Sequence, residues 1–305
     1  MKARPFMPRR LRPLVIAVLG LALALLSVRA CAPEPVRVAT FNIEMFPNPH
    51  TDRAAVAQAI AELDAHVLAL QEIVDGEAMR AVLAEASRIQ GRDWRLVLGP
   101  CGGDGFRVTT GVAWDASRVQ LVAARGYPGL DPSGDGVCSS DLPATAAVVT
   151  TDGGARLNVV SIHLRPFPEH YEQRKRQWPR VLTILGALRR EYGGEAIAIG
   201  DFNSTGFTTG PSDERGFVER IVADADMELL TGELPCTEYW QPVPPFSELL
   251  PSLLDHAVVT GGSWEEPQAL GMCERLQCRA TPRPAMDPRW RSVSDHCPVV
   301  VEAAL

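Results

Sequence analysis

The sequence is poor in aromatic residues and in the ligand types that zinc and copper prefer. Phe, Trp and Tyr make up 6% of its 305 residues, which leaves few platforms for stacking nucleic-acid bases. No pair of cysteines has the Cys-x-x-Cys spacing of a structural zinc site. The histidines and cysteines are scattered rather than clustered, so the composition favours neither a zinc nor a copper centre.

A run of apolar residues long enough to span a bilayer comfortably is also missing. The longest, from Leu14 to Val28, falls short of the roughly 20 residues that a spanning helix needs. It follows a basic stretch that contains Arg9, Arg10 and Arg12. We therefore predict that residues 1–30 are a signal peptide for export; an uncleaved N-terminal anchor is the alternative.

The residues after this apolar run suggest how the signal is removed. Val28-Arg29-Ala30-Cys31 resembles a bacterial lipobox, in which the cysteine becomes lipidated. Cleavage without lipidation stays open as the alternative. We predict an exported protein, either a cell-envelope lipoprotein attached to the membrane through Cys31 or a periplasmic or secreted protein. Residues 31–35 would be a short linker.

Seven cysteines are compatible with an oxidising compartment. If Cys31 carries a lipid, six remain, which allows complete pairing into disulfides. Cys101 and Cys138 flank one glycine-rich region and are a plausible pair. Cys236 could pair with Cys273 or with Cys278, and buried free thiols are the alternative to disulfides.

Removal of the signal peptide would make the protein markedly acidic. The first 30 residues hold six basic groups and no acid, so residues 31–305 carry 24 basic and 37 acidic side chains, a net charge of −13. Such a surface disfavours tight, sequence-independent binding of DNA. It does not exclude a nuclease, because bound metal ions reverse the local field at an active site.

Strand-like and helix-like patterns alternate from residue 36 to the C-terminus without an internal linker. The periodicity predicts one domain, residues 36–305, with an α/β fold of two packed sheets and outer helices. Predicted helices include one capped by Thr51-Asp52, then Gly76–Gln90 and His170–Tyr192. Predicted strands are Val36–Ile43, Val67–Leu70, Arg95–Leu98, Thr110–Trp114, Val119–Ala123, Ala144–Thr150, Leu157–His163, Ala196–Ile199, Leu253–Thr260 and Val299–Ala303.

Polar residues stand where several of these apolar strands end. They are Asn42, Glu72, His163, Asp201 with Asn203, Asp255-His256 and Asp295-His296. Strand ends are rigid and can hold several side chains around one point. Oxygen-rich ligands suit a hard cation such as Mg²⁺, which binds one or two carboxylates together with water and phosphate.

The ordered series of these motifs resembles the endonuclease/exonuclease/phosphatase superfamily, which includes deoxyribonucleases, exonuclease III-like enzymes, inositol polyphosphate 5-phosphatases and sphingomyelinases. The resemblance covers roughly residues 36–304 and implies a four-layer α/β/β/α sandwich with two packed mixed sheets. It also implies Mg²⁺-dependent hydrolysis of phosphate esters, with Mn²⁺ or Ca²⁺ as substitutes. The matching motifs are Thr40-Phe41-Asn42-Ile43, Leu70-Gln71-Glu72-Ile73, Ser161-Ile162-His163-Leu164, Gly200-Asp201-Phe202-Asn203, Leu254-Asp255-His256 and Ser294-Asp295-His296-Cys297-Pro298.

The resemblance implies a role for each matching position. Glu72 is expected to be the main carboxylate ligand of the metal, with Asn42 beside it and Asp295 contributing.

The remaining residues would handle water and phosphate. Asp201 is expected to orient and deprotonate the attacking water, and Asn203 to bind a phosphate oxygen. His296, held by Asp255, would contact the phosphate or act as the base. His163 would stabilise the transition state or protonate the leaving oxygen.

Several other basic residues and one further histidine are explained without a catalytic role, or with one only as a candidate. Arg107 and Arg165 are candidate contacts for a substrate phosphate, although solvated arginines are the simpler account. His256 is predicted to serve packing or to lie at the surface. The cluster Arg174-Lys175-Arg176 is predicted to be a solvated helix face.

We therefore predict an exported, Mg²⁺-dependent phosphoesterase, foremost an endonuclease-like phosphodiesterase acting on nucleic acid. A phospholipid- or phosphoinositide-directed esterase, similar to sphingomyelinases, is the alternative. A catalytically inactive binding protein on the same fold would have lost parts of the ligand set, which stands complete here. No protein partner is evident.

Overall fold

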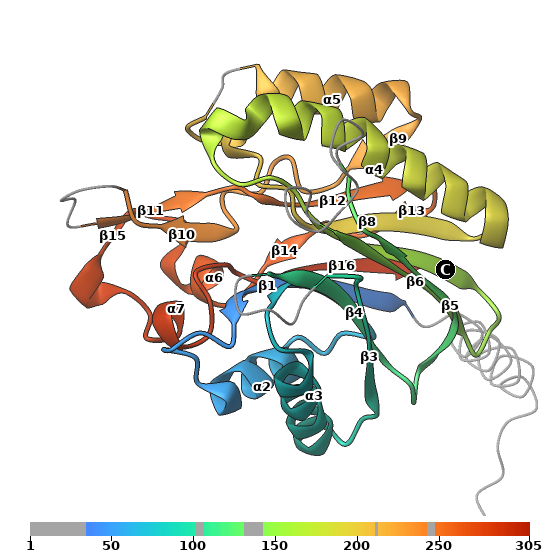
Figure 1. Cartoon of the computed structure of the whole chain (residues 1–305), viewed down its shortest axis with the longest axis horizontal. Helices are drawn as coiled ribbons and strands as arrows, with labels where there is room; N and C mark the ends of the chain where they lie inside the picture. Colours follow the sequence, from blue (N-terminus) through green and yellow to red (C-terminus); the bar gives the residue numbers. More distant parts are fainter. Residues whose placement is uncertain (1–34, 102–106, 131–142, 211–212, 243–247) are drawn as a thin grey trace, which may run out of the picture. The chain divides into compact units, whose positions relative to one another are not determined.

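Two mixed β-sheets lie face to face in the computed structural model, which describes residues 35–101, 107–130, 143–210, 213–242 and 248–305 (Figure 1). The first sheet has the strand order β13-β16-β1-β2-β4-β3, with β14 also paired to β16. Only β1 and β2 run parallel; the other pairs are antiparallel. Its strands are β1 (Val36–Phe46), β2 (Val67–Ile73), β3 (Trp94–Leu98), β4 (Thr109–Asp115), β13 (Ser263–Trp264), β14 (Gln268–Ala269) and β16 (Val299–Ala304).

The second sheet has the order β5-β6-β7-β8-β12-β9, and in it only β7 and β8 are parallel. Its central strands pack on those of the first sheet, with β7 against β2, β6 against β4 and β8 against β1. The core between the sheets is formed mainly by valine, isoleucine and alanine. The strands are β5 (Val119–Tyr127), β6 (Ala144–Thr151), β7 (Arg156–His163), β8 (Glu195–Asp201), β9 (Met227–Leu229) and β12 (Asp255–Thr260).

Helices cover the outer faces of both sheets. The helices α2 (Arg53–Glu62) and α3 (Gly76–Gln90) pack on the first sheet, and α4 (Tyr171–Tyr192) and α5 (Glu214–Asp224) pack on the second. The carboxylates of Asp52 and Asp75 accept backbone N–H groups and cap α2 and α3. The arrangement is the predicted four-layer α/β/β/α sandwich.

A smaller sheet and two short helices complete the described chain. The strands β10 (Glu238–Trp240), β11 (Glu248–Ser252) and β15 (Thr281–Pro282) pair in that order. Two disulfides, Cys236–Cys278 and Cys273–Cys297, lie beside this sheet. The helices α6 (Met272–Leu276) and α7 (Arg289–Ser292) and the 3-10 turns η1 (Pro168–His170), η2 (Thr205–Phe207) and η3 (Arg283–Ala285) lie in the connections.

Most predicted elements are present, with ends that shift by a few residues. The helix Gly76–Gln90 has the predicted bounds, and β1 continues three residues beyond the predicted Ile43. The prediction did not include α5, α6, α7 or the three-stranded sheet. Of the two partners predicted for Cys236, the structure selects Cys278, and it adds the pair Cys273–Cys297.

The prediction of a solvated Arg174 is wrong. Its side chain is fully buried and pairs with the equally buried carboxylate of Glu214, with 2.6 Å between Arg174 Nε and Glu214 Oε1. The guanidinium also donates to the carbonyls of Arg165 and Phe167. A guanidinium can join several chain segments in this way because it carries five N–H donors in a fixed geometry.

Several predictions concern residues beyond the described ranges. The signal peptide, Cys31 and all but the last residue of the linker are among them, as are Cys138 and most of the loop from Pro128 to Pro143. Residues Pro35–Leu305 group into one compact unit. Within the described part of the chain, no helix is both long and apolar enough to cross a membrane.

Candidate active site

The alternation of side chains along the central strands places the predicted site between the two sheets. In β1, Val36 and Val38 face the second sheet, and Asn42 continues that row. In β8 the same row runs through Ile197 and Ile199 to Asp201. His163 at the end of β7 and Asp255 at the start of β12 extend the equivalent rows, and each pairs with Asp201 in register. Four polar side chains therefore meet at one end of the sandwich.

Glu72 reaches the same place by a break in this alternation. Val67 and Ala69 face the second sheet, so regular pleating would turn residue 72 towards the helices. The register of β2 against β4 shifts between Leu70 and Ile73, and Glu72 has a φ of 61°. A bulge of this kind re-aims a side chain. It turns the Glu72 carboxylate to Asn42 Nδ2 at 3.1 Å and to the Met45 amide at 2.8 Å.

Asn42 links the two sheets. Its side-chain amide donates to Glu72 Oε1 in the first sheet and to Asp201 Oδ2 in the second, at 3.1 and 3.0 Å. His163 Nε2 lies 3.7 Å from Glu72 Oε1 and 3.6 Å from Asp201 Oδ2. One ligand atom from each of Glu72, His163 and Asp201 lies within 4.8 Å of the others, which is close enough to hold a metal ion.

The turn after β8 fixes Asp201 and Asn203 together. The Asn203 amide N–H donates to Asp201 Oδ1 at 2.8 Å, and its side chain donates to Asp201 Oδ2 and to the Leu164 carbonyl. Asn203 has a φ of 52°. Gly200, just before, must lack a Cβ because that atom would lie 2.1 Å from the Ile162 carbonyl. This close approach of β7 and β8 brings His163 next to Asp201.

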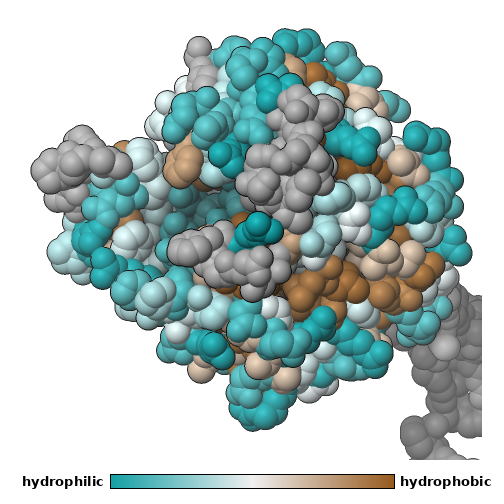
Figure 2. Space-filling view, in the orientation of Figure 1, coloured by the Kyte–Doolittle hydropathy of each residue, from teal (hydrophilic) through white to brown (hydrophobic). Residues whose placement is uncertain are grey.

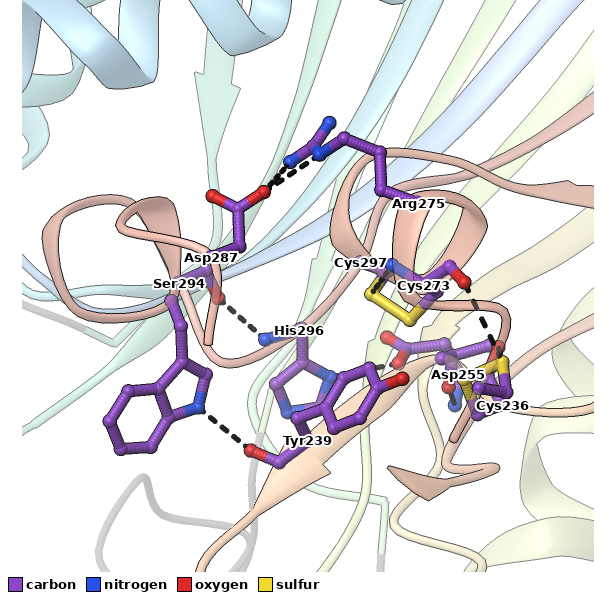
Figure 3. Close-up of a disulfide and its surroundings, with 12 residues drawn as sticks. Cys236, Tyr239, Asp255, Cys273, Arg275, Asp287, Ser294, His296 and Cys297 are labelled. Carbon is purple, nitrogen blue, oxygen red and sulfur yellow. Dashed lines mark hydrogen bonds and ion pairs between the residues drawn. A yellow bond between two sulfur atoms is a disulfide. The ribbon is translucent and has the colours of Figure 1, made fainter. Parts of the chain in front are cut away.

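The Ser294-Asp295-His296 segment is bound to β1 and to β12. Ser294 Oγ donates to the Asn42 carbonyl at 2.7 Å and accepts from the His296 amide at 3.0 Å. His296 Nδ1 lies 2.8 Å from Asp255 Oδ2, and its Nε2 is 3.8 Å from Asp201 Oδ2. The Asp255 carboxylate therefore orients the ring (Figure 3), and Nε2 is left facing Asp201.

The charges of this region act strongly on one another. Burial disfavours the charged ring of His296, but the carboxylates of Asp255 and Asp201 outweigh it and raise the pKa of His296 well above 6.5. Burial also raises the pKa of Asp201 to about 6, against the opposing effect of His296. The pKa of Asp295 is raised by burial and by the nearby Glu72 carboxylate.

Two acidic residues that sequence reasoning missed also belong to this region. Burial and the carboxylates of Asp295 and Glu72 raise the pKa of Glu44 to about 8. Glu238 in β10 is 8% exposed, and burial raises its pKa well above 4.5 in spite of the nearby His296. Glu44 stands two residues after Asn42, a spacing that could have indicated it. Glu238 has no motif around it and is placed only by the pairing of β10.

These residues fit a divalent cation. Repulsion between Glu44, Glu72 and Asp295 contributes to the raised pKa values, and a cation among their oxygens would relieve it. Oxygen donors of this kind are the ligands that Mg²⁺ prefers. Asn42, Glu72 and Asp295 are the predicted ligands, and of these Glu72 belongs to the group with His163 and Asp201 whose ligand atoms lie within 4.8 Å of one another. Glu44 lies beside them.

The two candidate arginines lie in different surroundings. Arg107 is exposed and borders an undescribed segment. Arg165 is half-buried just after β7, and its Nε has no hydrogen-bond partner among the described residues. His256, in contrast, is fully buried beside Trp178, Phe202 and Phe207, and burial lowers its pKa to about 3. Its predicted packing role agrees with this position.

Comparison with known proteins assigns the chain to a family. It matches the model of the Endonuclease/Exonuclease/phosphatase family over residues 39–296 and belongs to this family, whose members are hydrolases acting on phosphoester bonds. Comparison with curated protein sequences gives no match.

Solved structures share the fold at low sequence identity. An endonuclease/exonuclease/phosphatase family protein from Leptotrichia buccalis superposes with a TM-score of 0.63 at 13% identity, over 88% of this chain and 99% of that one. D. rerio TDP2 complexed with a single-strand DNA product gives 0.61 at 15% identity, over 89% and 99%. The mannosyl-6-phosphatase Bt3783 of Bacteroides thetaiotaomicron gives 0.58 at 15% identity, over 88% and 99%.

Proposed function

We propose that this protein is an exported, Mg²⁺-dependent phosphodiesterase of the endonuclease type. The observation that carries this proposal is the convergence of Glu72, His163 and Asp201 from three different strands onto one point between the sheets. Burying like charges together destabilises a fold, and such clusters often mark a binding or catalytic site. Figure 2 shows the surface hollowed beside the junction of the two sheets, with hydrophilic residues lining the hollow.

The side chains divide the work of hydrolysis. Asp201 orients the attacking water, and Asn203 donates to a phosphate oxygen. His296, held by Asp255 at 2.8 Å, donates from Nε2 to the phosphate, and His163 stands ready to protonate the leaving oxygen. When a divalent cation is bound, it would neutralise the charge of the phosphate. In the alternative scheme a neutral His296 takes the proton of the water at Nε2 and does not donate to the phosphate.

Nucleic acid is our first choice of substrate. Phe167 follows His163 by four residues and is 60% exposed, which makes it a platform on which a base can stack. A structural neighbour, D. rerio TDP2, has been captured with a single-strand DNA product.

A phospholipid head group is the second candidate. Two of the large apolar side chains exposed on the described surface, Met45 and Phe167, follow the site residues Asn42 and His163 closely in the chain. Apolar side chains beside a phosphate site suit a substrate with an apolar part, and export would bring the enzyme to such lipids. The cell-envelope location is tested by labelling Cys31 with fatty acid; an unlabelled, soluble mature protein would remove the lipid anchor from the proposal.

The metal site is tested with Glu72→Gln, which keeps the size of the side chain and removes its charge. We expect hydrolysis of bis-p-nitrophenyl phosphate with Mg²⁺ to fall by about 10²–10³-fold, and a chelator to abolish the wild-type activity. The exposed Glu77→Gln on α3 is the matched control and should leave the rate unchanged. Wild-type activity in Glu72→Gln would contradict the site.

The substrate is identified by a panel of plasmid DNA, RNA, sphingomyelin and phosphoinositides with the mature protein and Mg²⁺. Phe167→Ala separates the recognition of a base from the chemistry. It should lower kcat/KM on DNA or RNA by roughly tenfold, the value of about 1–3 kcal/mol for one stacked base, and leave bis-p-nitrophenyl phosphate unaffected. Turnover of sphingomyelin but not of nucleic acid would favour the second candidate.

A further inference from the structure

Thr237 contacts Asp255 and the residue that follows His296. Its Oγ1 accepts the Asp255 amide N–H at 2.9 Å, and its carbonyl accepts the Cys297 amide N–H at 2.7 Å, directly after His296. Two residues on, the Tyr239 amide donates to the Asp295 carbonyl at 2.9 Å. The segment from Thr237 to Tyr239 therefore sets the distance between the Asp255 carboxylate and the His296 ring.

Each side of this junction is also attached covalently to α6 or to the turn directly after it. Cys236 precedes Thr237 and forms a disulfide with Cys278, whereas Cys297 follows His296 and forms a disulfide with Cys273 (Figure 3). Cys273 lies in α6, and Cys278 follows two residues after that helix ends, with its amide bonded to the Cys273 carbonyl. The Cys273 amide donates to Cys297 Sγ at 3.1 Å. One short segment thus holds both halves of the junction.

The bridges add covalent links to the hydrogen bonds that already hold these segments. α6 has five residues, and the buried cluster around it contains Tyr239, Leu249 and Met272 besides three of the cysteines. The large cores against the sheets consist of other residues. The chain after Cys297 continues into β16, which pairs with β1 and β14, so the two bridges are the covalent part of a larger set of contacts around His296.

We propose that Cys236–Cys278 and Cys273–Cys297 are positioning bridges, which hold the His296 ring against Asp255 and thereby set the turnover rate. The expected effect on the turnover rate rests on the proposed function. The position of the His296 ring against Asp255 does not. The cysteines do not touch the substrate. They act through Thr237 and His296, and a displacement of about 1 Å at a catalytic group can cost roughly 10²-fold in rate.

The same arrangement makes the junction open to thiol reagents at one sulfur. Cys236, Cys273 and Cys297 are buried, whereas Cys278 is partly exposed. A dithiol reductant attacks Cys278 Sγ and releases the Cys236 thiolate; its second thiol then displaces Cys278, and the reductant leaves as a disulfide.

Exchange can then pass to the second bridge. Sulfur atoms of Cys236, Cys273 and Cys278 lie within 4.8 Å of one another. The Cys236 thiolate can attack Cys273 Sγ, which forms a Cys236–Cys273 bond and releases Cys297 as a thiolate. The segment after His296 then loses its covalent attachment.

Two double variants test the inference, Cys273→Ala/Cys297→Ala and Cys236→Ala/Cys278→Ala. With Mg²⁺ and bis-p-nitrophenyl phosphate we expect kcat to fall by roughly 10²-fold while KM changes by less than about twofold. Arg275→Met, which removes the ion pair of α6 with Asp287 but no bridge, is the matched control and should keep wild-type kcat.

A second measurement reports on position without relying on activity. The ring N–H of His296 that is bonded to Asp255 should give a downfield proton resonance in the wild type, absent in Asp255→Asn. We expect it to be lost or shifted in both double variants and retained in Arg275→Met. Folded double variants with wild-type kcat and an unchanged resonance would overturn the inference.

Two further outcomes remain informative. If the double variants do not fold, the folded wild type is treated with dithiothreitol, and alkylation with mass spectrometry identifies the opened bridge. Loss of the resonance as Cys297 becomes alkylated supports the inference, and its persistence refutes it. If the wild type hydrolyses no phosphodiester, the proposed function fails, whereas the resonance still decides the positioning role.

Discussion

At the scale of single residues, the site depends on backbone conformations that ordinary strands avoid. Glu72 and Asn203 have φ values of 61° and 52°, and both would be more relaxed with a regular strand or turn. The strain is compensated by the hydrogen bonds that their side chains make to Asn42 and Asp201. Such residues are found where function requires a fixed side chain.

Glu238 shows the cost of a buried acid in the same region. Its pKa is raised by burial, so the folded protein holds a proton that the unfolded chain releases above pH 4.5. Metal-free wild-type protein should therefore lose up to about 1.4 kcal/mol of stability per pH unit above 4.5, until the folded group also ionises. Glu238→Gln should be more stable than the wild type at pH 7–8 in thermal or urea unfolding with a chelator present.

A matched control for that experiment is Glu248→Gln, because Glu248 is an exposed acid on the neighbouring strand β11. It should leave the pH dependence as it is in the wild type. Equal stability of Glu238→Gln and wild type across pH 5–8 would show that the carboxylate is not penalised by burial.

His256 should make the stability of the protein depend on pH in the opposite direction under acidic conditions. Burial lowers its pKa to about 3 from 6.5, so between these values the unfolded chain binds a proton that the folded protein does not. The stability of the wild type should then fall by up to about 1.4 kcal/mol per pH unit as the pH drops from 6.5 towards 3. His256→Phe should flatten this part of the curve in denaturant titrations, whereas replacing the exposed His50 by Gln should not.

At the scale of elements, the Arg174–Glu214 pair joins α4 and α5 to the loops beside the site. Besides Arg174, Glu214 accepts the Gly206 amide at 2.8 Å, in the turn that follows Asn203. Arg174 donates to the carbonyls of Arg165 and Phe167, in the loop that follows His163. The pair thus holds both the loop that follows His163 and the turn that follows Asn203.

Removing one partner of this pair should destabilise the fold strongly. Arg174→Met leaves a buried carboxylate without its counter-charge, and we expect the free energy of unfolding to fall by about 3–5 kcal/mol. Arg174→Met/Glu214→Leu should recover part of this loss in a double-mutant cycle measured by urea unfolding. Arg180→Met, on the exposed face of the same helix, is the control and should change stability by less than about 0.5 kcal/mol.

At the scale of the whole molecule, the metal should stabilise the sandwich, because its proposed ligands come from both ends of the chain. Asn42, Glu72 and Asp295 lie on β1, β2 and the segment before β16. Mg²⁺ at 100 times its Kd should add about 2.7 kcal/mol, a rise in Tm of roughly 5–10 °C. Calorimetry should show no such rise for Glu72→Gln; an equal rise would place the ion elsewhere.

Much of the architecture could be predicted because it depends on local patterns. Alternating valine-rich strands, the capping residues Asp52 and Asp75, and the ordered strand-end motifs are all visible along the chain. Arg174 and Glu238 were missed because no local pattern distinguishes them from solvated residues. Their burial follows from partners 40 residues away in one case and from the pairing of a three-residue strand in the other.

The family and the layered α/β fold could be predicted from the amino-acid sequence, since the family has an ordered series of motifs and the fold follows from hydrophobic periodicity. The candidate site residues could be named in the same way, from their chemistry at strand ends. How those residues meet depends on the folded structure. The bulge that turns Glu72 inward, the choice of Cys278 as the partner of Cys236, and the attachment of His296 through Thr237 and Cys297 all depend on contacts between distant segments. Such contacts form only when the two sheets and α6 have packed, so periodicity along the chain does not predict them.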